Sequence, residues 1–231
     1  MSMMAQVEVF DSPEEVAQAA ARWLAARVNA AVAQRKHAEL ALAGGTTPGR
    51  AYALFGQDPG VPWDRVRLYF SDERCVSPDD PESNYRMARA ALSQSGRVPP
   101  ETLVRMQGEL PDREAAARAY AALLPPAFDV VVLGIGEDGH TASLFPGSEA
   151  LDEAARRVVA VRSPKPPAWR LTLTPLVLSQ ARALLVLATG SGKSAAVARA
   201  LAPEGEVQKT PARLAAKAGA TWMLDRAAAP G

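Results

Sequence analysis

Short apolar runs alternate with stretches of helical spacing along most of this chain. Ser12-Pro13-Glu14-Glu15 has the form of a capping box with proline at the first helical position, and the apolar residues after it recur at helical spacing. The pattern predicts one long helix that ends near His37. His37 would lie at the polar end of this helix, so we expect it at the surface.

After this helix, the pattern predicts alternating strands and helices. Each predicted strand is a short apolar run that ends in glycine or polar residues. The predicted strands comprise residues 38–43, 66–70, 129–133, 183–188 and 221–224. The predicted helices comprise residues 49–55, 83–92 and 194–201, with Thr46-Thr47-Pro48 capping the first of them. This alternation favours an α/β protein with a parallel sheet covered on both faces. Residues 164–167, which include three prolines, are predicted to form a loop.

The chemically rich segments of the chain all follow predicted strands. In an open parallel sheet, ligands bind beyond the carboxyl ends of the strands, where the strand order reverses. We therefore expect these segments to meet in one crevice. They are residues 44–48, 71–74, 134–140 and 190–193.

Composition narrows the class of protein. With 231 residues, 48% of them hydrophobic, the chain can bury one sizeable core, so we expect residues 1–231 to form a single domain. The formal net charge of +1 creates no field that would recruit nucleic acid or an anionic membrane. No apolar run is long enough to span a bilayer, and the N-terminus lacks the pattern of a secretory signal.

Cysteine and histidine are scarce, which limits disulfide and metal chemistry. The single cysteine, Cys75, cannot form an internal disulfide, and one cysteine with two histidines is too few for most zinc sites. These features favour a reducing, cytoplasmic setting. Since no segment shows an obvious exposed apolar stripe, we expect a monomer.

Two glycine-rich segments are similar to nucleotide-binding motifs without completing them. Gly190-Ser191-Gly192-Lys193 matches the end of a P-loop, but Leu187 stands where that motif needs its first glycine. Lys193 could still bind one phosphate group at a helix start, or it could be a solvated lysine. Residues 134–139 satisfy G-x-G-x-x-G, yet the residues after them predict a loop where dinucleotide sites have a helix.

The turn after residues 129–133 carries the strongest catalytic candidate, His140. A lone histidine in a loop is more often structural. Here Asp138 lies two residues earlier, and a carboxylate at that distance can fix the tautomer and orientation of the imidazole. Because histidine has an ordinary pKa of about 6.5, it can accept a proton near neutral pH. The sequence therefore predicts a catalytic role for His140.

Two further segments could hold an anion. Gly44-Gly45-Thr46-Thr47 offers accessible backbone, hydroxyl groups and helix N-terminal amides, although an ordinary tight turn would look the same. Asp72-Glu73-Arg74 places two carboxylates and a guanidinium after a predicted strand, where Arg74 could bind a phosphate or the segment could be a solvated turn. We interpret the neighbouring Cys75 as a small buried side chain rather than a nucleophile.

Five ordered blocks of the sequence resemble the 6-phosphogluconolactonase family, within the larger glucosamine-6-phosphate isomerase/deaminase-like superfamily. The blocks are residues 43–48, 71–76 with 80–85, 134–146, 170–174 and 190–193. The resemblance implies a three-layer α/β/α fold with a mostly parallel, Rossmann-like sheet. It also implies hydrolysis of 6-phospho-D-glucono-1,5-lactone to 6-phospho-D-gluconate, a step of the oxidative pentose phosphate pathway, without a cofactor.

The resemblance further implies roles for single residues. His140 matches the family's proposed general base, and Asp138 lies in the same block with a less defined role. A lactone is an activated ester, so its hydrolysis needs a base for water and donors for the oxyanion more than a metal. The residues that would hold the substrate phosphate or line its site are Gly44, Gly45, Thr46, Thr47, Asp72, Arg74, Arg170 and Lys193.

Two alternatives remain open. Similar glucosamine-6-phosphate deaminases carry Asp-Glu-Tyr where this chain has Asp72-Glu73-Arg74, and a glutamate where it has Phe145. Both departures favour the lactonase, because phenylalanine cannot relay a proton. A sugar-phosphate-binding module would bind 6-phosphogluconate without hydrolysing the lactone. The placement of His140 beside Asp138 argues against such a module.

Overall fold

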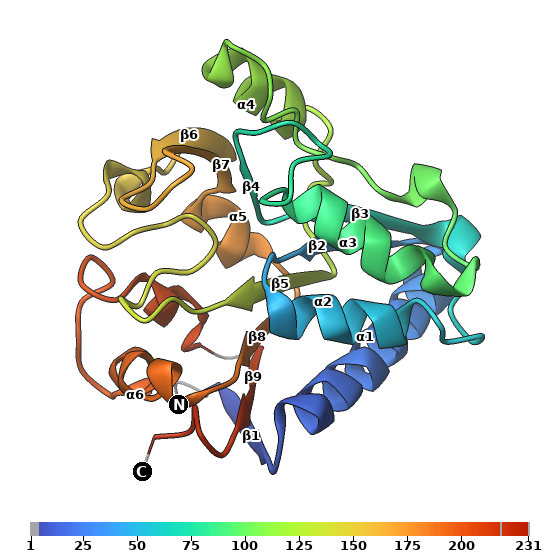
Figure 1. Ribbon diagram of the computed structural model, residues 1–231, viewed down its shortest axis with the longest axis horizontal. Coiled ribbons are helices and arrows are strands. Elements are labelled where there is room, and N and C mark those ends of the chain that lie inside the picture. Colours follow the sequence, from blue (N-terminus) through green and yellow to red (C-terminus); the bar gives the residue numbers. More distant parts are fainter. Residues whose placement is uncertain (1–4, 218, 231) are drawn as a thin grey trace.

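A six-stranded parallel sheet forms the centre of the computed structural model, which describes residues 5–217 and 219–230. The order of its strands is β1-β9-β8-β5-β2-β3 (Figure 1), and every neighbouring pair is parallel. The strands are β1 Gln6–Phe10, β2 Ala38–Leu42, β3 Val66–Phe70, β5 Val130–Gly134, β8 Leu184–Ala188 and β9 Ala220–Asp225. The expected parallel sheet is therefore confirmed.

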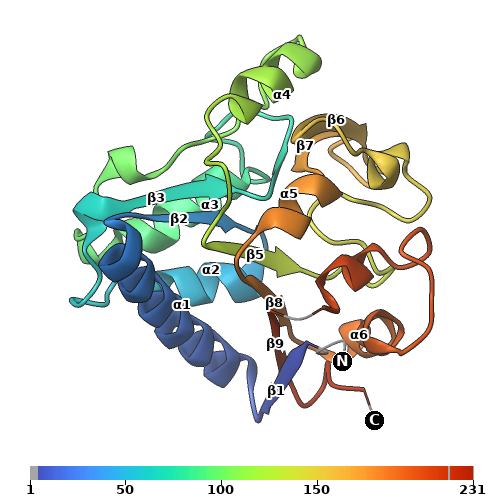
Figure 2. The same ribbon diagram turned by 180° about the vertical axis from the view of Figure 1, so that it is seen from behind.

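Helices cover both faces of this sheet, which confirms the three-layer α/β/α arrangement. Figures 1 and 2 show α1 and α2 on one side of β8 and β9, and α5 and α6 on the other. α3 packs against α2, and α4 packs against a second sheet. The helices are α1 Pro13–Arg35, α2 Thr46–Phe55, α3 Asn84–Leu92, α4 Arg113–Ala121, α5 Pro175–Gln180 and α6 Ser194–Leu201.

The central strands form the core because they are apolar on both faces. The residues of β8 are all buried, and so are the first four of β5. Near-continuous apolar runs are typical of parallel strands with a helical layer on each side. Each fully buried valine or leucine there contributes about 1.5–3 kcal/mol to stability relative to an exposed position.

The long first helix begins as predicted. The Ser12 hydroxyl accepts a hydrogen bond from the Glu15 backbone amide, and Glu15 in turn accepts one from the Asp11 amide. The helix ends at Arg35, where Lys36 adopts a left-handed conformation, and His37 is exposed as expected. No helix among the described residues has both the length and the hydrophobicity needed to cross a membrane.

A second sheet was not predicted. It has three antiparallel strands in the order β4-β7-β6, which are β4 Asp72–Arg74, β6 Val158–Arg162 and β7 Trp169–Leu173. Of the two alternatives for Asp72-Glu73-Arg74, the solvated turn is therefore excluded, because the segment is a strand. Charged residues have low strand propensity, and only pairing with the distant β7 supplies the hydrogen bonds that hold these three residues extended.

The start of α2 also differs from the prediction. The helix begins at Thr46, three residues before the predicted start, and Gly45 is its N-cap with φ of 109°. No side chain caps this end, so the expected threonine cap was wrong. β1, α4 and α5 were not predicted either. Alanine is frequent in α4, and β1 is an edge strand with mostly exposed side chains, so neither has a clear apolar pattern.

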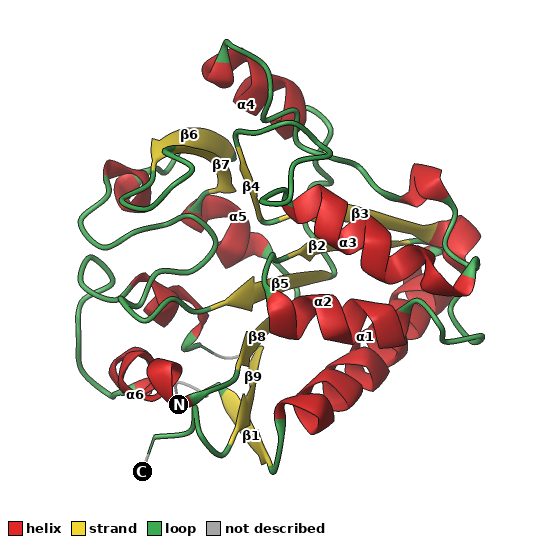
Figure 3. Ribbon diagram, in the orientation of Figure 1, coloured by secondary structure: helices red, strands yellow, loops and turns green. Residues whose placement is uncertain are grey.

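The strand order reverses between β2 and β5. From β2 the chain moves outward to β3, whereas β5 lies on the other side of β2 and leads on to β8 and β9. Loops that leave the carboxyl ends of such a strand pair diverge and leave a crevice between them. The segments after β2 and β5, green in Figure 3, are the glycine turns that begin at Gly44 and follow Gly134.

Candidate active site

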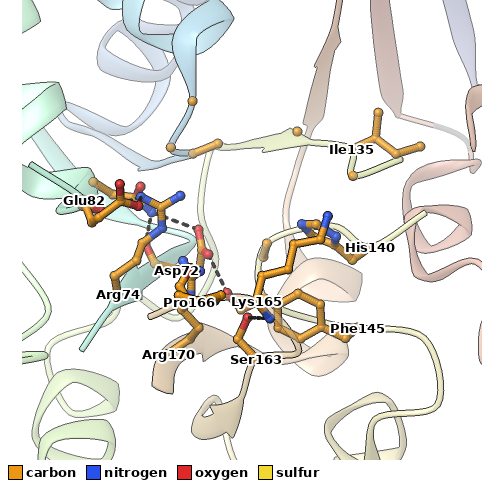
Figure 4. A pocket seen from close by; sticks show the side chains of 18 of the residues that line it. Asp72, Arg74, Glu82, Ile135, His140, Phe145, Ser163, Lys165, Pro166 and Arg170 are labelled. Carbon is orange, nitrogen blue, oxygen red and sulfur yellow. Dashed lines mark hydrogen bonds and ion pairs between the residues drawn. The ribbon is translucent and has the colours of Figure 1, made fainter. Parts of the chain in front are cut away.

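A cavity of about 370 Å³ lies at this switch point, and the four chemically rich segments converge on it. The predicted site residues that line it are Gly44, Gly45, Asp72, Arg74, His140, Arg170 and Lys193. Figure 4 shows Arg74, Arg170, Asp72 and Glu82 at one end of the cavity, and His140 with Lys165 at the other. The cavity therefore has a guanidinium-rich end and an imidazole end.

The imidazole of His140 is held by Asp138, as the sequence predicted. His140 Nδ1 lies 2.6 Å from Asp138 Oδ1, which also accepts a hydrogen bond of 3.1 Å from the His140 backbone amide. The Phe145 ring packs on the imidazole with a centroid distance of 4.9 Å. These contacts orient the ring, and the bond at Nδ1 leaves Nε2 as the nitrogen that can accept a proton.

The carboxyl group of Asp138 is ionised more readily than an ordinary aspartate. Burial acts to raise its pKa, but the hydrogen bonds and charge of His140, with a smaller contribution from Lys165, outweigh burial and lower it. Since the charge of Lys165 is felt at Asp138, its ammonium group belongs to the imidazole end of the cavity.

This lowered pKa predicts a pH-dependent contribution to stability. A carboxyl group with a lowered native pKa stabilises the folded state above its unfolded value, near 3.8, and loses that contribution as the pH falls through the native value. Asp138→Asn should therefore be less stable than the parent protein at pH 7, and the difference should shrink below pH 4. Urea unfolding at several pH values measures it. A difference that does not change with pH would refute this account.

Two guanidinium groups face each other at the opposite end of the cavity. Arg74 on β4 is the direct cross-strand partner of Arg170 on β7. Like charges at such positions repel, and burial together with the Arg74 charge lowers the pKa of Arg170. Arg74 donates a hydrogen bond to the Glu82 carbonyl oxygen, and Arg170 donates one of 3.2 Å to Pro166. Among the described residues, neither Nε atom has a hydrogen-bond partner. A bound anion would relieve the repulsion.

Side chains alternate between the two faces of β4, so Asp72 and Arg74 lie on one face and Glu73 on the other. Asp72 is 8% exposed and lines the cavity, where it accepts hydrogen bonds from Ser143 Oγ at 2.6 Å and Asn84 Nδ2 at 3.2 Å. Glu73 points the other way and accepts bonds from the backbone amides of Asn84 and Tyr85 at the start of α3. Glu73 thus fixes α3 against the strand that carries the two cavity residues.

Gly44, in the turn after β2, lies so close to Asn84 of α3 that only glycine fits there. A Cβ atom on Gly44 would lie 2.0 Å from Asn84 Oδ1, so no larger residue fits while Asn84 bonds to Asp72. Thr46 and Thr47 do not line the cavity. Thr47 Oγ1 instead lies 2.7 Å from Thr189 Oγ1, which ties the start of α2 to the loop after β8.

Several cavity residues were not predicted as site residues, namely Glu82, Asn84, Ser143, Ser163 and Lys165. Lys165 lies in the proline-rich loop, and nothing near it in the sequence indicates that the loop folds over the cavity. Ser143 follows His140 in the same turn, which was the available clue. Cys75 is half-buried, and burial raises the pKa of its thiol, as expected for a side chain that is not a nucleophile.

Comparison with known proteins identifies the family of the chain. A protein-family model described as "Glucosamine-6-phosphate isomerases/6-phosphogluconolactonase" matches residues 11–223. The 6-phosphogluconolactonase of Mycobacterium leprae is 39% identical over 245 residues, covering 98% of each chain. The human 6-phosphogluconolactonase is 35% identical, covering 96% of this chain and 92% of the human protein.

Solved structures show the same fold. The 6-phosphogluconolactonase from Trypanosoma cruzi has a TM-score of 0.85 at 32% identity, covering 99% of this chain and 97% of that one. A monomeric glucosamine-6-phosphate deaminase has a TM-score of 0.83 at 26% identity, covering 96% and 98%. The family match spans almost the whole chain, as do both enzyme relatives. The chain therefore belongs to the glucosamine-6-phosphate isomerase/6-phosphogluconolactonase family.

Proposed function

We propose that this protein hydrolyses 6-phospho-D-glucono-1,5-lactone to 6-phospho-D-gluconate, a step of the oxidative pentose phosphate pathway. One observation carries the proposal: a single cavity holds an oriented imidazole at one end and two opposed guanidinium groups at the other. The substrate has matching ends, a reactive ester carbonyl and a phosphate. Relatives named for this activity cover nearly all of the chain.

His140 would act first as a base and then as an acid. Its Nε2 takes a proton from water, and the resulting hydroxide attacks the lactone carbonyl carbon to give a tetrahedral intermediate. When the intermediate collapses, the bond to the ring oxygen breaks, and the imidazolium returns its proton to that oxygen. Asp138 holds the ring in the required tautomer and stabilises the imidazolium charge. Backbone amides of the Gly134–Gly139 turn are the candidate oxyanion donors.

The substrate phosphate would bind between Arg74 and Arg170. A phosphate dianion there neutralises two cations that otherwise repel, and guanidinium groups bind phosphate through paired hydrogen bonds. Lys193 adds a further cation to the cavity wall. This binding holds the lactone in a pose that water can attack, so distant contacts lower the barrier at the carbonyl.

Arg74→Ala and Lys193→Ala should each raise KM about tenfold or more with little change in kcat, because each removes a charge-assisted hydrogen bond to the substrate. Arg65→Ala is the matched control, since Arg65 is half-exposed and lies outside the cavity. Initial rates over a range of lactone concentrations measure the effect. Unchanged KM in both site variants would show that the phosphate binds elsewhere.

The activity itself is tested with freshly made 6-phosphogluconolactone in a coupled assay, corrected for spontaneous hydrolysis. Glucosamine 6-phosphate is assayed in parallel. We expect turnover of the lactone only. Deamination of glucosamine 6-phosphate without lactone hydrolysis would assign the protein to the other activity of its family. Binding of 6-phosphogluconate with no turnover of either substrate would indicate a binding module.

Deamination of glucosamine 6-phosphate fits this site less well than lactone hydrolysis. Ring opening and enolisation of an amino sugar need acid and base groups beyond one histidine. Phe145, which stands where similar deaminases carry a glutamate, packs its ring on the imidazole and cannot carry a proton.

A monomer in a reducing, cytoplasmic setting fits this function. Light scattering coupled to gel filtration tests the oligomeric state.

A further inference from the structure

A buried carboxylate forms hydrogen bonds with the backbone of the loop that carries Lys193. Asp225, the last residue of β9, is 4% exposed and lies outside the cavity. Its Oδ1 and Oδ2 accept hydrogen bonds of 3.0 and 3.1 Å from the Gly190 backbone amide. Oδ1 also accepts one of 2.8 Å from the Ala228 amide. One side chain therefore joins the glycine loop to the C-terminal segment.

Strand register brings these groups together. β8 and β9 are parallel neighbours, and their last paired residues are Ala188 and Leu224. The next residue of β9 is Asp225, so its carboxylate stands beside the loop that leaves β8. Gly190 has φ of 89°, a left-handed conformation that glycine adopts without strain, and its amide turns toward the carboxylate. The turn Ser191–Lys193 follows directly.

Other hydrogen bonds also hold this loop, including one of 3.0 Å from the Lys193 amide to the Gly190 carbonyl oxygen. Thr189 bonds to Thr47 through their hydroxyl groups, and Ser194 Oγ donates a hydrogen bond of 3.1 Å to the Ala229 carbonyl oxygen. The Asp225 bonds lie between the Thr189 and Ser194 contacts, at the amide of the glycine where the chain changes direction. A buried carboxylate bonded to two backbone amides is a strong and geometrically defined anchor.

We propose that Asp225 is a positioning residue that sets the place of Lys193 in the cavity, and that it acts on substrate affinity only through that lysine. The inference rests on the proposed function, because it assumes that Lys193 contacts the sugar phosphate. It adds a residue outside the cavity, at the end of the last strand, to the groups that determine substrate binding.

The first test compares two substitutions of Asp225. Asp225→Ala removes every acceptor from the Gly190 amide, and KM for the lactone should rise about tenfold, the same range as loss of a charge-assisted hydrogen bond. Asp225→Asn keeps one oxygen that can accept from both amides, so it should recover most of the affinity. In both variants kcat should stay within about twofold of the parent value, since His140 and Asp138 are not disturbed.

A double-mutant cycle separates positioning from a general loss of structure. In the Lys193→Ala background, Asp225→Ala should raise KM no further, because the lysine through which it acts is gone. Additive effects on KM would overturn the proposal. So would an unchanged KM in Asp225→Ala alone, or equal losses for the Ala and Asn variants.

Asp129→Asn is the matched control. Asp129 is also a buried aspartate, 7% exposed, and it accepts a hydrogen bond of 2.9 Å from the Glu39 backbone amide at the far end of the sheet. It should lose stability with KM unchanged. A similar rise of KM in this control would show that instability alone explains the effect and would overturn the proposal.

Binding of 6-phosphogluconate, followed by calorimetry, distinguishes failure of this inference from failure of the proposed activity. If the parent protein does not hydrolyse the lactone, the proposed activity is wrong, but the same cycle can be run on affinity. Weaker binding in Asp225→Ala that disappears in the Lys193→Ala background would support the positioning role. Equal affinity of the parent and Asp225→Ala would refute it.

Discussion

Replacing His140 with alanine should lower kcat for lactone hydrolysis by about a hundredfold or more, which is the usual contribution of a general base. KM should change little, because the guanidinium groups that we propose to bind the phosphate lie at the other end of the cavity. The residual rate would come from substrate binding and from the backbone amides of the turn. Rates must be measured well above spontaneous hydrolysis of the lactone.

The matched control for this variant is His37→Ala. His37 is the other histidine of the chain, is exposed, and follows the end of α1 outside the cavity. It should leave both kcat and KM at the parent values. If His140→Ala turned over the lactone at the parent rate, the imidazole would have no part in the reaction, and a different base would be needed.

Much of the fold followed from local patterns. The apolar runs of β2, β3, β5, β8 and β9 are nearly continuous, and such runs predict buried parallel strands without knowledge of their neighbours. The capping box at Ser12 likewise needs only the residues beside it. The short strand β4 shows the opposite case. Its three charged residues are extended only because β7, far along the chain, pairs with them.

The candidate site likewise has parts that neighbouring residues in the sequence predict and parts that depend on contacts between distant segments. His140 and Asp138 were predicted as a pair because they are two residues apart, and their contact of 2.6 Å forms within one turn. The opposition of Arg74 and Arg170 could not be derived from the residues, because it depends on the register between β4 and β7. Lys165 was missed for a related reason. The loop that carries it reaches the cavity only through the β6–β7 hairpin.

Spacing alone indicated only that His140 and Asp138 form a candidate catalytic pair. The type of reaction came from the resemblance to a family, and the shape of the binding site came from neither. The proposed substrate-binding residues lie on β4, on β7 and in the loop after β8, whose positions depend on tertiary pairing. Resemblance to a family named the guanidinium groups as site residues, but the structure gives the physical reason that an anion is favourable between them.

Gly136→Ala should lower kcat nearly as much as loss of the imidazole itself. A Cβ atom at this position would lie 2.1 Å from Nδ1 and 2.2 Å from Cε1 of His140, and 2.5 Å from Oδ1 of Asp138. Contacts that short are impossible, so the imidazole must leave its bond to Asp138. The backbone of Gly136 is not in the left-handed region, so the effect comes from the methyl group alone.

We expect kcat to fall by about a hundredfold, since the displaced histidine can no longer act as an oriented base. The fold should survive, because the side chain of His140 is 24% exposed and can turn toward solvent. Gly60→Ala, at a surface turn where the nearest atom would be 3.2 Å away, is the control for a glycine-to-alanine change. Combining Gly136→Ala with His140→Ala should add little to either single loss, because both remove the same base. If Gly136→Ala kept kcat within about threefold of the parent, the Asp138–His140 contact would not be needed for turnover, and the catalytic role of that pair would have to be abandoned.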